Sequence, residues 1–290
     1  VSIGATNSNT IGHTRFETVC NAEFSNISQI GPVTIKLSGI DGYPSGYTFE
    51  KIASTAFQTD GYKAVAEMMN GVSDKTGIKV KVNNTQILGV VAAGEVKDLR
   101  INGVLIGNIK TQANDADNAL IGAINAKKDE TGVEASLENG KLVLAAKDGR
   151  AIRIGAFSSG ANTVFSAKTG ASLASGAHSA GTVYFGQITF IRQDARDIKI
   201  GIDGISLAAG FSQGEAMITG AASKAYNQSS VNLKYMNAGT IKNDIAKAMG
   251  FFDGREASTA GDQAGGVNTY GGAQAMIDVA EAARKTLDKL

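Results

Sequence analysis

The sequence predicts an α+β protein that is rich in strands and elongated, built from small strand-helix-strand modules with a long helix at its C-terminal end. Composition favours many turns, because 290 residues include 36 Gly, 2 Pro and no Trp. Short alternating apolar runs are bounded by turn residues along most of the chain. The segment GVSDKTGIKVKVNNT at 71–85 recurs in related form 55 positions later, at 126–140, as AKKDETGVEASLENG. The chain therefore repeats a unit rather than forming one large core.

Charge and cysteine content exclude several protein classes. The 28 basic residues nearly balance the 27 acidic ones, so net charge indicates neither a nucleic-acid nor a membrane partner. With 43% hydrophobic residues the chain is expected to fold. Cys20 is the single cysteine, so an internal disulfide and a cysteine-based zinc site are both impossible. No run of about 18 apolar residues occurs, and no membrane-spanning helix is predicted.

The first predicted module covers 16–93. Residues 24–42 and 47–52 have the alternation of strands, with Gly, Pro, Asp and Asn at the turns. A helix is predicted to begin at an Asp60 cap and to end at Thr76-Gly77. Its buried face is formed by residues at helical spacing: Val65, Met68, Met69 and Val72. The alternating residues IKVKV then form a strand with one buried face.

The second predicted module covers 94–182 and repeats this order. Asn102-Gly103 stands between apolar residues within 99–109, which indicates a hairpin. A helix within 114–132 places Leu120, Ala123 and Ile124 at the positions of Val65, Met68 and Met69. Gly132 matches Gly77, and both are expected to end a helix in the left-handed conformation. Three strands within 133–155 and a Gly/Ala/Ser-rich bridge at 155–182 complete the module.

The third predicted module covers 183–270, with strands at 183–207 around the turn at 194–196. A short helix within 239–252 has Thr240 as its expected cap. The final helix, 273–290, carries a narrow apolar stripe, typical of a coiled-coil or bundle seam whose partner helix lies outside this chain. The stripe consists of Met276, Val279, Ala280, Ala283, Leu287 and Leu290. Because the chain starts abruptly and ends within this pattern, we expect it to be a fragment.

Motifs for catalysis and metal binding are missing from the sequence. His13 and His178 stand in polar stretches without partners, and there is no HExxH, Walker or G-x-S-x-G motif. The stretch NDADN at 114–118 resembles the start of a calcium loop, but Ala119 and Asn125 stand where the loop needs Gly and Glu. No catalytic, cofactor-binding or metal-ligating residue is predicted, and we do not expect an enzyme.

Three triplets follow one another within 99–155: Ile101-Asn102-Gly103, Ala123-Ile124-Asn125 and Thr131-Gly132-Val133. In this order they resemble the flagellin hook IN motif. Outside the motif, four further segments are similar to flagellins of the Campylobacter and Helicobacter group, namely 11–18, 187–200, 241–251 and 271–290. The resemblance covers most of the chain in the expected order.

The resemblance implies a structural subunit of the bacterial flagellar filament, secreted and extracellular, that serves motility and antigenicity. This chain would be its surface-exposed centre, with 1–15 and 271–290 forming a stub of the inner helical domain and both polymerising ends missing. The implied partners are other flagellin subunits, bound through the missing ends, an export chaperone and the filament cap. No nucleic-acid or membrane partner is implied, and the fragment itself is expected to be monomeric.

Flagellins of this group carry O-linked sugars on exposed Ser and Thr, which makes the 155–182 bridge a candidate site of glycosylation. The alternative is an unmodified loop. The candidate acceptors are Ser158, Ser159, Thr163, Ser166, Thr169, Ser172, Ser175 and Ser179.

Two other functions remain open at this point. A hook-associated or cap protein can also contain the IN motif, although the 271–290 segment favours a flagellin. A glycan- or host-binding adhesin could stack sugars on aromatic side chains. The aromatic candidates are Tyr43, Tyr47, Tyr184 and Phe185, all in strand-like runs where core packing is expected.

Overall fold

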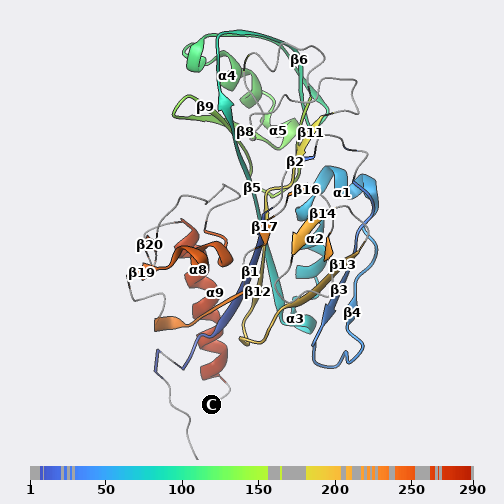
Figure 1. Cartoon of the computed structure of the whole chain (residues 1–290), viewed down its shortest axis with the longest axis vertical. Coiled ribbons are helices and arrows are strands. Elements are labelled where there is room, and N and C mark those ends of the chain that lie inside the picture. The colour runs from blue at the N-terminus through green and yellow to red at the C-terminus, as the bar shows by residue number, and fades with distance from the viewer. Residues whose placement is uncertain are drawn as a thin grey trace, which may run out of the picture.

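The structure is a computed structural model that describes most of the chain. The described residues are 7–8, 10–20, 23–24, 27, 30–155, 164, 181–203, 207–210, 217–218, 221–222, 224–225, 228–234, 239–251, 262–264, 267 and 270–288. The molecule is elongated and strand-rich, as the sequence predicts, with one long strand running between its two halves (Figure 1). Within the described part of the chain, no helix is long and apolar enough to cross a membrane.

The largest sheet is organised around β5 (Ile78–Val90). The strand order is β17 (Lys224–Ala225), β1 (Thr14–Cys20), β12 (Gln187–Arg192), β5, β9 (Lys141–Ala146) and β8 (Glu134–Glu138), with β18 (Ser229–Val231) also paired to β1. β5 pairs with β12 over residues 78–83 and with β9 over residues 84–90, antiparallel in both cases. One strand therefore joins the two halves of the molecule.

Smaller sheets flank this one. The five-stranded sheet has the order β2 (Glu23–Phe24), β11 (Thr182–Tyr184), β10 (Ile152–Gly155), β6 (Gly94–Ile101) and β7 (Val104–Thr111). A three-stranded sheet consists of β13 (Lys199–Asp203), β3 (Thr34–Ser38) and β4 (Tyr47–Thr48). The remaining strands are β14 (Leu207–Gly210), β15 (Met217–Ile218), β16 (Ala221–Ala222), β19 (Thr240–Ile241) and β20 (Gln263–Ala264).

The helices are short except for the last. They are α1 (Ser54–Asp60), α2 (Tyr62–Asn70), α3 (Ser73–Thr76), the 3-10 turn η2 (Ala113–Asp115), α4 (Ala119–Asn125), α5 (Lys128–Thr131), α8 (Asn243–Ala248) and α9 (Tyr270–Leu287). Helices pack into each of three separate apolar cores among the described residues. α1 and α2 pack into the first, α4 into the second, and α8 with α9 into the third.

Strands β1 and β12 lie between the first and third cores. Val19 and Phe190 point into the first core, and Phe16 and Ile191 point into the third. All six residues of β12 are buried, as expected of a strand that is covered on both faces. The first core combines residues from 19–82 with residues from 151–200. This core does not follow the predicted module boundaries, which stay a prediction.

Two predicted helix starts are wrong. Asp60 does not cap the first helix, because α1 and α2 meet at Gly61, whose φ is 54° and which has no room for a Cβ beside Phe185. Thr240 lies in β19 rather than at the start of α8. The N-H of Asn243, the first residue of α8, donates to Asp262 Oδ1 at 3.2 Å. The group at this helix start therefore comes from a distant part of the sequence.

The repeated segments, 71–85 and 126–140, form the same helix-to-strand junction twice, as predicted. α3 ends at Gly77 (φ 70°, ψ 8°) and leads into β5, while α5 ends at Gly132 (φ 71°, ψ 15°) and leads into β8. The Gly77 N-H donates to Ser73 O at 2.8 Å, and the Gly132 N-H donates to Lys128 O at 2.7 Å. In both copies a left-handed residue turns the chain out of a helix, where glycine has no Cβ clash.

The two glycines differ in their surroundings, which allows a matched test. A Cβ at Gly77 would meet nothing within 4 Å, whereas one at Gly132 would lie 2.5 Å from Arg150 Cζ. Gly77→Ala should lower the free energy of unfolding by about 1–2 kcal/mol for the left-handed backbone alone. Gly132→Ala should cost up to about 1 kcal/mol more, because Arg150 must leave its ion pair with Asp148.

Urea unfolding of both variants measures these costs, and Arg150→Ala serves as the control background. In that background the two glycine substitutions should become equally costly. A larger cost for Gly77→Ala would contradict the assignment.

Candidate functional site: the motif around Asn102 and Asn125

The candidate site is the motif cluster, defined here as the nine residues of the three triplets at 101–103, 123–125 and 131–133. The structure brings these segments together from the β6-β7 hairpin, α4 and the α5-β8 junction. Ile101, Ile124 and Val133 are buried members of the second core, and Ala123 packs against it half-buried. The apolar half of the motif therefore forms the centre of a core.

Asn102 connects the hairpin to two other segments. Its Oδ1 accepts the Arg153 N-H and its Nδ2 donates to Thr131 O, both at 2.8 Å. The Asn102 N-H donates to Arg153 O at 2.9 Å. Asn102 and Gly103 both have positive φ (51° and 85°), as the predicted two-residue turn requires. A residue first identified as a turn residue thus also fixes where α5 and β10 lie.

Asn125 binds the main chain of β8. Its Oδ1 accepts the Ala135 N-H at 2.7 Å and its Nδ2 donates to Ala135 O at 2.9 Å. β8 is the outer strand of the large sheet among the described strands, so these main-chain groups face away from β9. Unpaired strand edges invite pairing with other chains. The Asn125 amide therefore closes one position of that edge.

Asn70 makes the same contact in the other copy of the repeat. Its Oδ1 accepts the Val80 N-H and its Nδ2 donates to Val80 O, both at 2.8 Å. Asn70 and Val80 stand 55 positions before Asn125 and Ala135. The threonines agree as well, because Thr76 Oγ1 accepts from the Ile78 N-H and Thr131 Oγ1 from the Val133 N-H. The sequence analysis named Asn125 in the motif but missed Asn70, although the spacing of 55 residues between them could have shown that the two are equivalent.

The segment that resembles a calcium loop has a different use. Asp115 is 1% exposed, and its two carboxylate oxygens accept the N-H groups of Leu120 and Ile121, each at 2.9 Å. A carboxylate at this position satisfies free N-H groups at the start of a helix and opposes its positive end. Asp115 therefore holds the start of α4.

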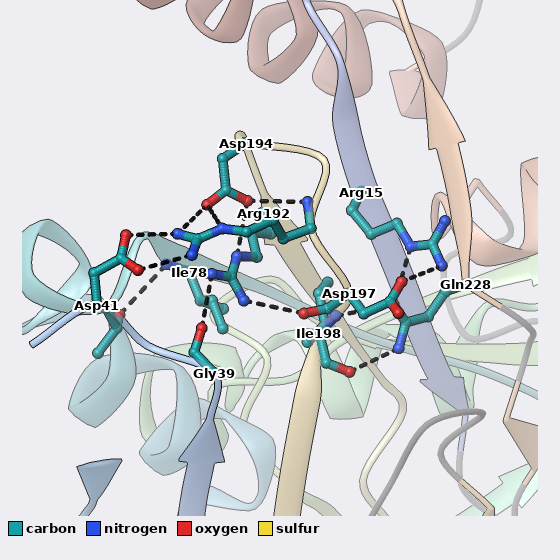
Figure 2. Close-up of polar contacts among 11 residues, drawn as sticks. Arg15, Gly39, Asp41, Ile78, Arg192, Asp194, Asp197, Ile198 and Gln228 are labelled. Atoms are coloured by element: carbon teal, nitrogen blue, oxygen red, sulfur yellow. Dashed lines mark hydrogen bonds and ion pairs between the residues drawn. The ribbon is translucent and has the colours of Figure 1, made fainter. Parts of the chain in front are cut away.

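A second polar cluster surrounds the turn after β12 (Figure 2). Arg192 is 1% exposed, and its guanidinium donates to Asp194 Oδ1 at 2.8 Å and to the carbonyls of Asp197 and Gly39 at 3.0 Å. Arg196, in contrast, is exposed and binds both oxygens of Asp41 at 2.8 Å. The turn is thereby joined to the loop between β3 and β4 (Figure 2).

Two pKa shifts accompany this cluster. Burial raises the pKa of Asp194, but hydrogen bonds from Arg196 and the charge of Arg192 outweigh it and leave the pKa below its ordinary value. The Arg196 hydrogen bonds and charge also hold the pKa of Asp41 low. Both carboxyls therefore stabilise the fold at neutral pH, and this contribution is lost as pH falls through their lowered pKa values. Every guanidinium contact is structural, and none presents a reactive group.

The apolar stripe of the last helix only partly faces the core. Val279 and Ala283 are buried, Met276 is half-buried, and Ala280 and Leu287 are exposed. The buried face also includes Ala275, Asp278 and Ala282. β1, β5 and β12 of this same chain thus cover part of the face that was expected to need an external partner helix.

Ion pairs fasten α9 to β5. Lys81 Nζ lies 2.5 Å from Asp278, and Lys79 Nζ lies 2.5 Å from Glu281. Burial raises the pKa of Asp278 despite its bond to Lys81, whereas the bonds from Lys79 and Gln193 lower the pKa of Glu281. A cavity of about 200 Å³ lies at this junction, lined in part by Lys81 and Asp278. These two charges already pair with one another.

The remaining candidates contribute little chemistry. Tyr184 and Phe185 are at most 1% exposed. Tyr43 and Tyr47 are half-buried against the first core, with their ring centroids 5.0 Å apart in an edge-on arrangement. The described residues hold no cluster of metal-ligating side chains. All eight candidate O-glycosylation residues, Ser158 to Ser179, lie outside the described residues, as does His178.

The two asparagine contacts make a paired prediction. Asn125→Leu should leave the Ala135 N-H and C=O without their hydrogen-bond partner. We expect this to lower the free energy of unfolding by about 1–3 kcal/mol. Hydrogen exchange of the Ala135 amide should accelerate while that of Val80 stays unchanged. Asn70→Leu should give the reverse pattern, and equal acceleration at both amides in either variant would refute the local role.

Comparison with known proteins shows what this chain resembles. Residues 98–148 match the family model described as the flagellin hook IN motif, which contains the whole motif cluster. The chain is 33% identical over 303 residues to Flagellin B of Helicobacter pylori (strain ATCC 700392 / 26695), covering 100% of this chain and 55% of that protein. It is 30% identical to Flagellin A of the same strain and 32% identical to Flagellin A of Helicobacter mustelae, covering 54% and 58% of those proteins and all of this chain.

The chain thus spans about half the length of the curated relatives it matches. The matches extend well beyond the IN motif, as the resemblances at 11–18, 187–200, 241–251 and 271–290 predict. With the motif in place and a match along its whole length, the chain is similar to the flagellins of Helicobacter throughout.

Proposed function

We propose that the protein is a structural subunit of the bacterial flagellar filament and that this chain forms the central, surface-exposed part of the subunit. The observation that carries the proposal is the match to Helicobacter flagellins along all of the chain, together with the IN motif at 98–148. On this proposal the protein is secreted, serves motility and carries no catalytic activity.

The arrangement of the chain supports an outward-projecting role. Gly12 lies directly against Val279, since a Cβ at Gly12 would come within 3.0 Å of the Val279 carbonyl oxygen. Residues near both ends of the described chain therefore lie side by side at one end of the elongated molecule (Figure 1). α4, β6 and β9 lie at the opposite end (Figure 1). Such modules can be inserted into a longer protein without separating the segments on either side.

Polymerisation belongs to the parts of the protein outside this chain. The exposed apolar residues Ile277, at 55%, and Leu287, at 47%, lie on α9 and support a helical contact there in the whole protein. We propose other flagellin subunits as the partners of the whole protein, with an export chaperone and the cap acting before and during assembly. The residues of the stripe that this chain leaves exposed, Ala280 and Leu287, are then the place where it meets the inner helices.

Immunogold electron microscopy tests the filament proposal against its alternatives. Antibodies raised against residues 94–155 should label the whole length of flagella on the bacterium that encodes this chain, with a gene-deletion strain as control. Label restricted to the filament base or tip would indicate a hook-associated or cap protein. Label elsewhere on the cell surface would refute a flagellar location and favour an adhesin.

Glycosylation remains part of the same proposal, at the eight Ser and Thr candidates between Ser158 and Ser179. Peptide mass spectrometry of protein sheared from cells should find added sugar mass within 155–182, with peptides of the buried β12 region unmodified as an internal control. Unmodified 155–182 peptides recovered in full would remove the glycan proposal while leaving the filament proposal intact.

A further inference from the structure

The chain contains three Asn-Gly dipeptides, Asn70-Gly71, Asn102-Gly103 and Asn139-Gly140. An asparagine followed by glycine is the dipeptide most prone to cyclise, because the glycine nitrogen is unhindered by a side chain and the glycine backbone is permissive. Whether a particular pair reacts in a folded protein depends on how firmly the asparagine is held. The three pairs in this chain differ sharply in that respect.

Two of the asparagines are locked. Asn70 ends α2 with both atoms of its amide bound to the main chain of Val80 at 2.8 Å. Asn102 holds the Arg153 N-H and Thr131 O, also at 2.8 Å. In each case the side-chain amide must break two hydrogen bonds to main-chain groups before its Cγ can turn toward the following nitrogen.

The third asparagine is not held in this way. Asn139 and Gly140 form the two-residue turn between β8 and β9, where Glu138 pairs with Lys141. Their φ angles are 52° and 77°, as in the mirror-image turns that close hairpins. The Asn139 side chain is exposed and makes no hydrogen bond with any described residue. Rotation of its side chain toward the Gly140 nitrogen therefore breaks no side-chain hydrogen bond to a described residue.

We propose that Asn139 is a site of spontaneous deamidation, with water as the other reactant. The backbone nitrogen of Gly140 forms a bond to Cγ of Asn139 and gives up its proton. The bond between Cγ and Nδ2 breaks, and the nitrogen leaves as ammonia with that proton, which produces a five-membered succinimide. Water then adds to one of the two succinimide carbonyls and opens the ring to aspartate or isoaspartate, without any oxidation or reduction.

The product changes the hairpin in two ways. Either product places a new carboxylate beside Glu138 and Lys141. Isoaspartate also inserts its Cβ into the main chain, which a turn of two residues cannot absorb without movement. The movement would disturb the end of β5, because the Gly140 carbonyl accepts the Val91 N-H at 2.9 Å and Lys141 pairs with Val90.

The effect on the assembled protein rests on the proposed function. In a filament outside the cell, subunits are not individually replaced, so the modification would accumulate with filament age on the exposed end of the outer modules. The chemistry at Asn139 does not depend on that role and is tested separately from it.

The test is a time course of the purified full-length protein at mildly alkaline pH, followed by rapid digestion and peptide mass spectrometry that distinguishes aspartate from isoaspartate. Asn70 and Asn102 serve as comparators within the same molecule. In the folded protein Asn139 should deamidate roughly tenfold faster or more than either, because each of the others must first break two hydrogen bonds. In protein unfolded by urea the three rates should come within a few-fold of one another.

Two controls keep the outcome decisive. Asn139→Ser should abolish the isoaspartate signal from the 134–146 peptide while leaving the slow reactions at Asn70 and Asn102 unchanged. A folded-state rate at Asn139 no higher than at the two locked asparagines would overturn the proposal. The same would follow if the ratio of the three rates were equal in folded and unfolded protein, since the fold would then have no part in selecting the site.

Discussion

The pairing of β5 with two different partners is the constraint on which the rest of the structure depends. Its first half completes the sheet with β12 and its second half completes the sheet with β9. Ile78 and Val80 enter the first core, and Leu88 enters the second. β5 is one continuous strand that pairs with β12 in one half of the molecule and with β9 in the other. The two halves therefore cannot move apart without breaking main-chain hydrogen bonds of one pair or the other.

β5 changes its pairing from β12 to β9 at Asn84, and the contacts of the residues around this point allow the change. Asn84 is 0% exposed, and its Nδ2 donates to Arg150 O at 2.7 Å and to Tyr184 O at 2.8 Å. Gly186 (φ 74°) passes so closely that a Cβ there would lie 2.3 Å from the Asn83 carbonyl oxygen. A side chain on Gly186 would push β12 away from β5, so glycine is required for this close approach. The Asn84 amide in turn joins the main chain at Arg150 to the end of β11 from a buried position.

Local features of this fold could be predicted from the sequence, and non-local ones could not. The glycine junctions at Gly77 and Gly132, the Asn102-Gly103 hairpin and the buried positions Val65 and Met69 depend on residues within one or two turns of chain, where periodicity and turn preference are informative. The bond between Asp262 and Asn243, and that between Arg192 and Gly39, join distant segments and leave no periodic signal. The α9 stripe was predicted from spacing alone, which could not reveal that Asp278 is buried with Lys81 at its centre.

Native-state hydrogen exchange along β5 in low concentrations of denaturant tests the central claim most directly. If β5 unites the two halves, the slowest amides of 78–83 and of 84–90 should open with the same free energy and the same dependence on denaturant, together with the protected amides of β9 and β12. If the amides of 84–90 and β9 open at a clearly lower free energy while 78–83 and β12 stay protected, the halves are independent units and the account of a shared strand is contradicted.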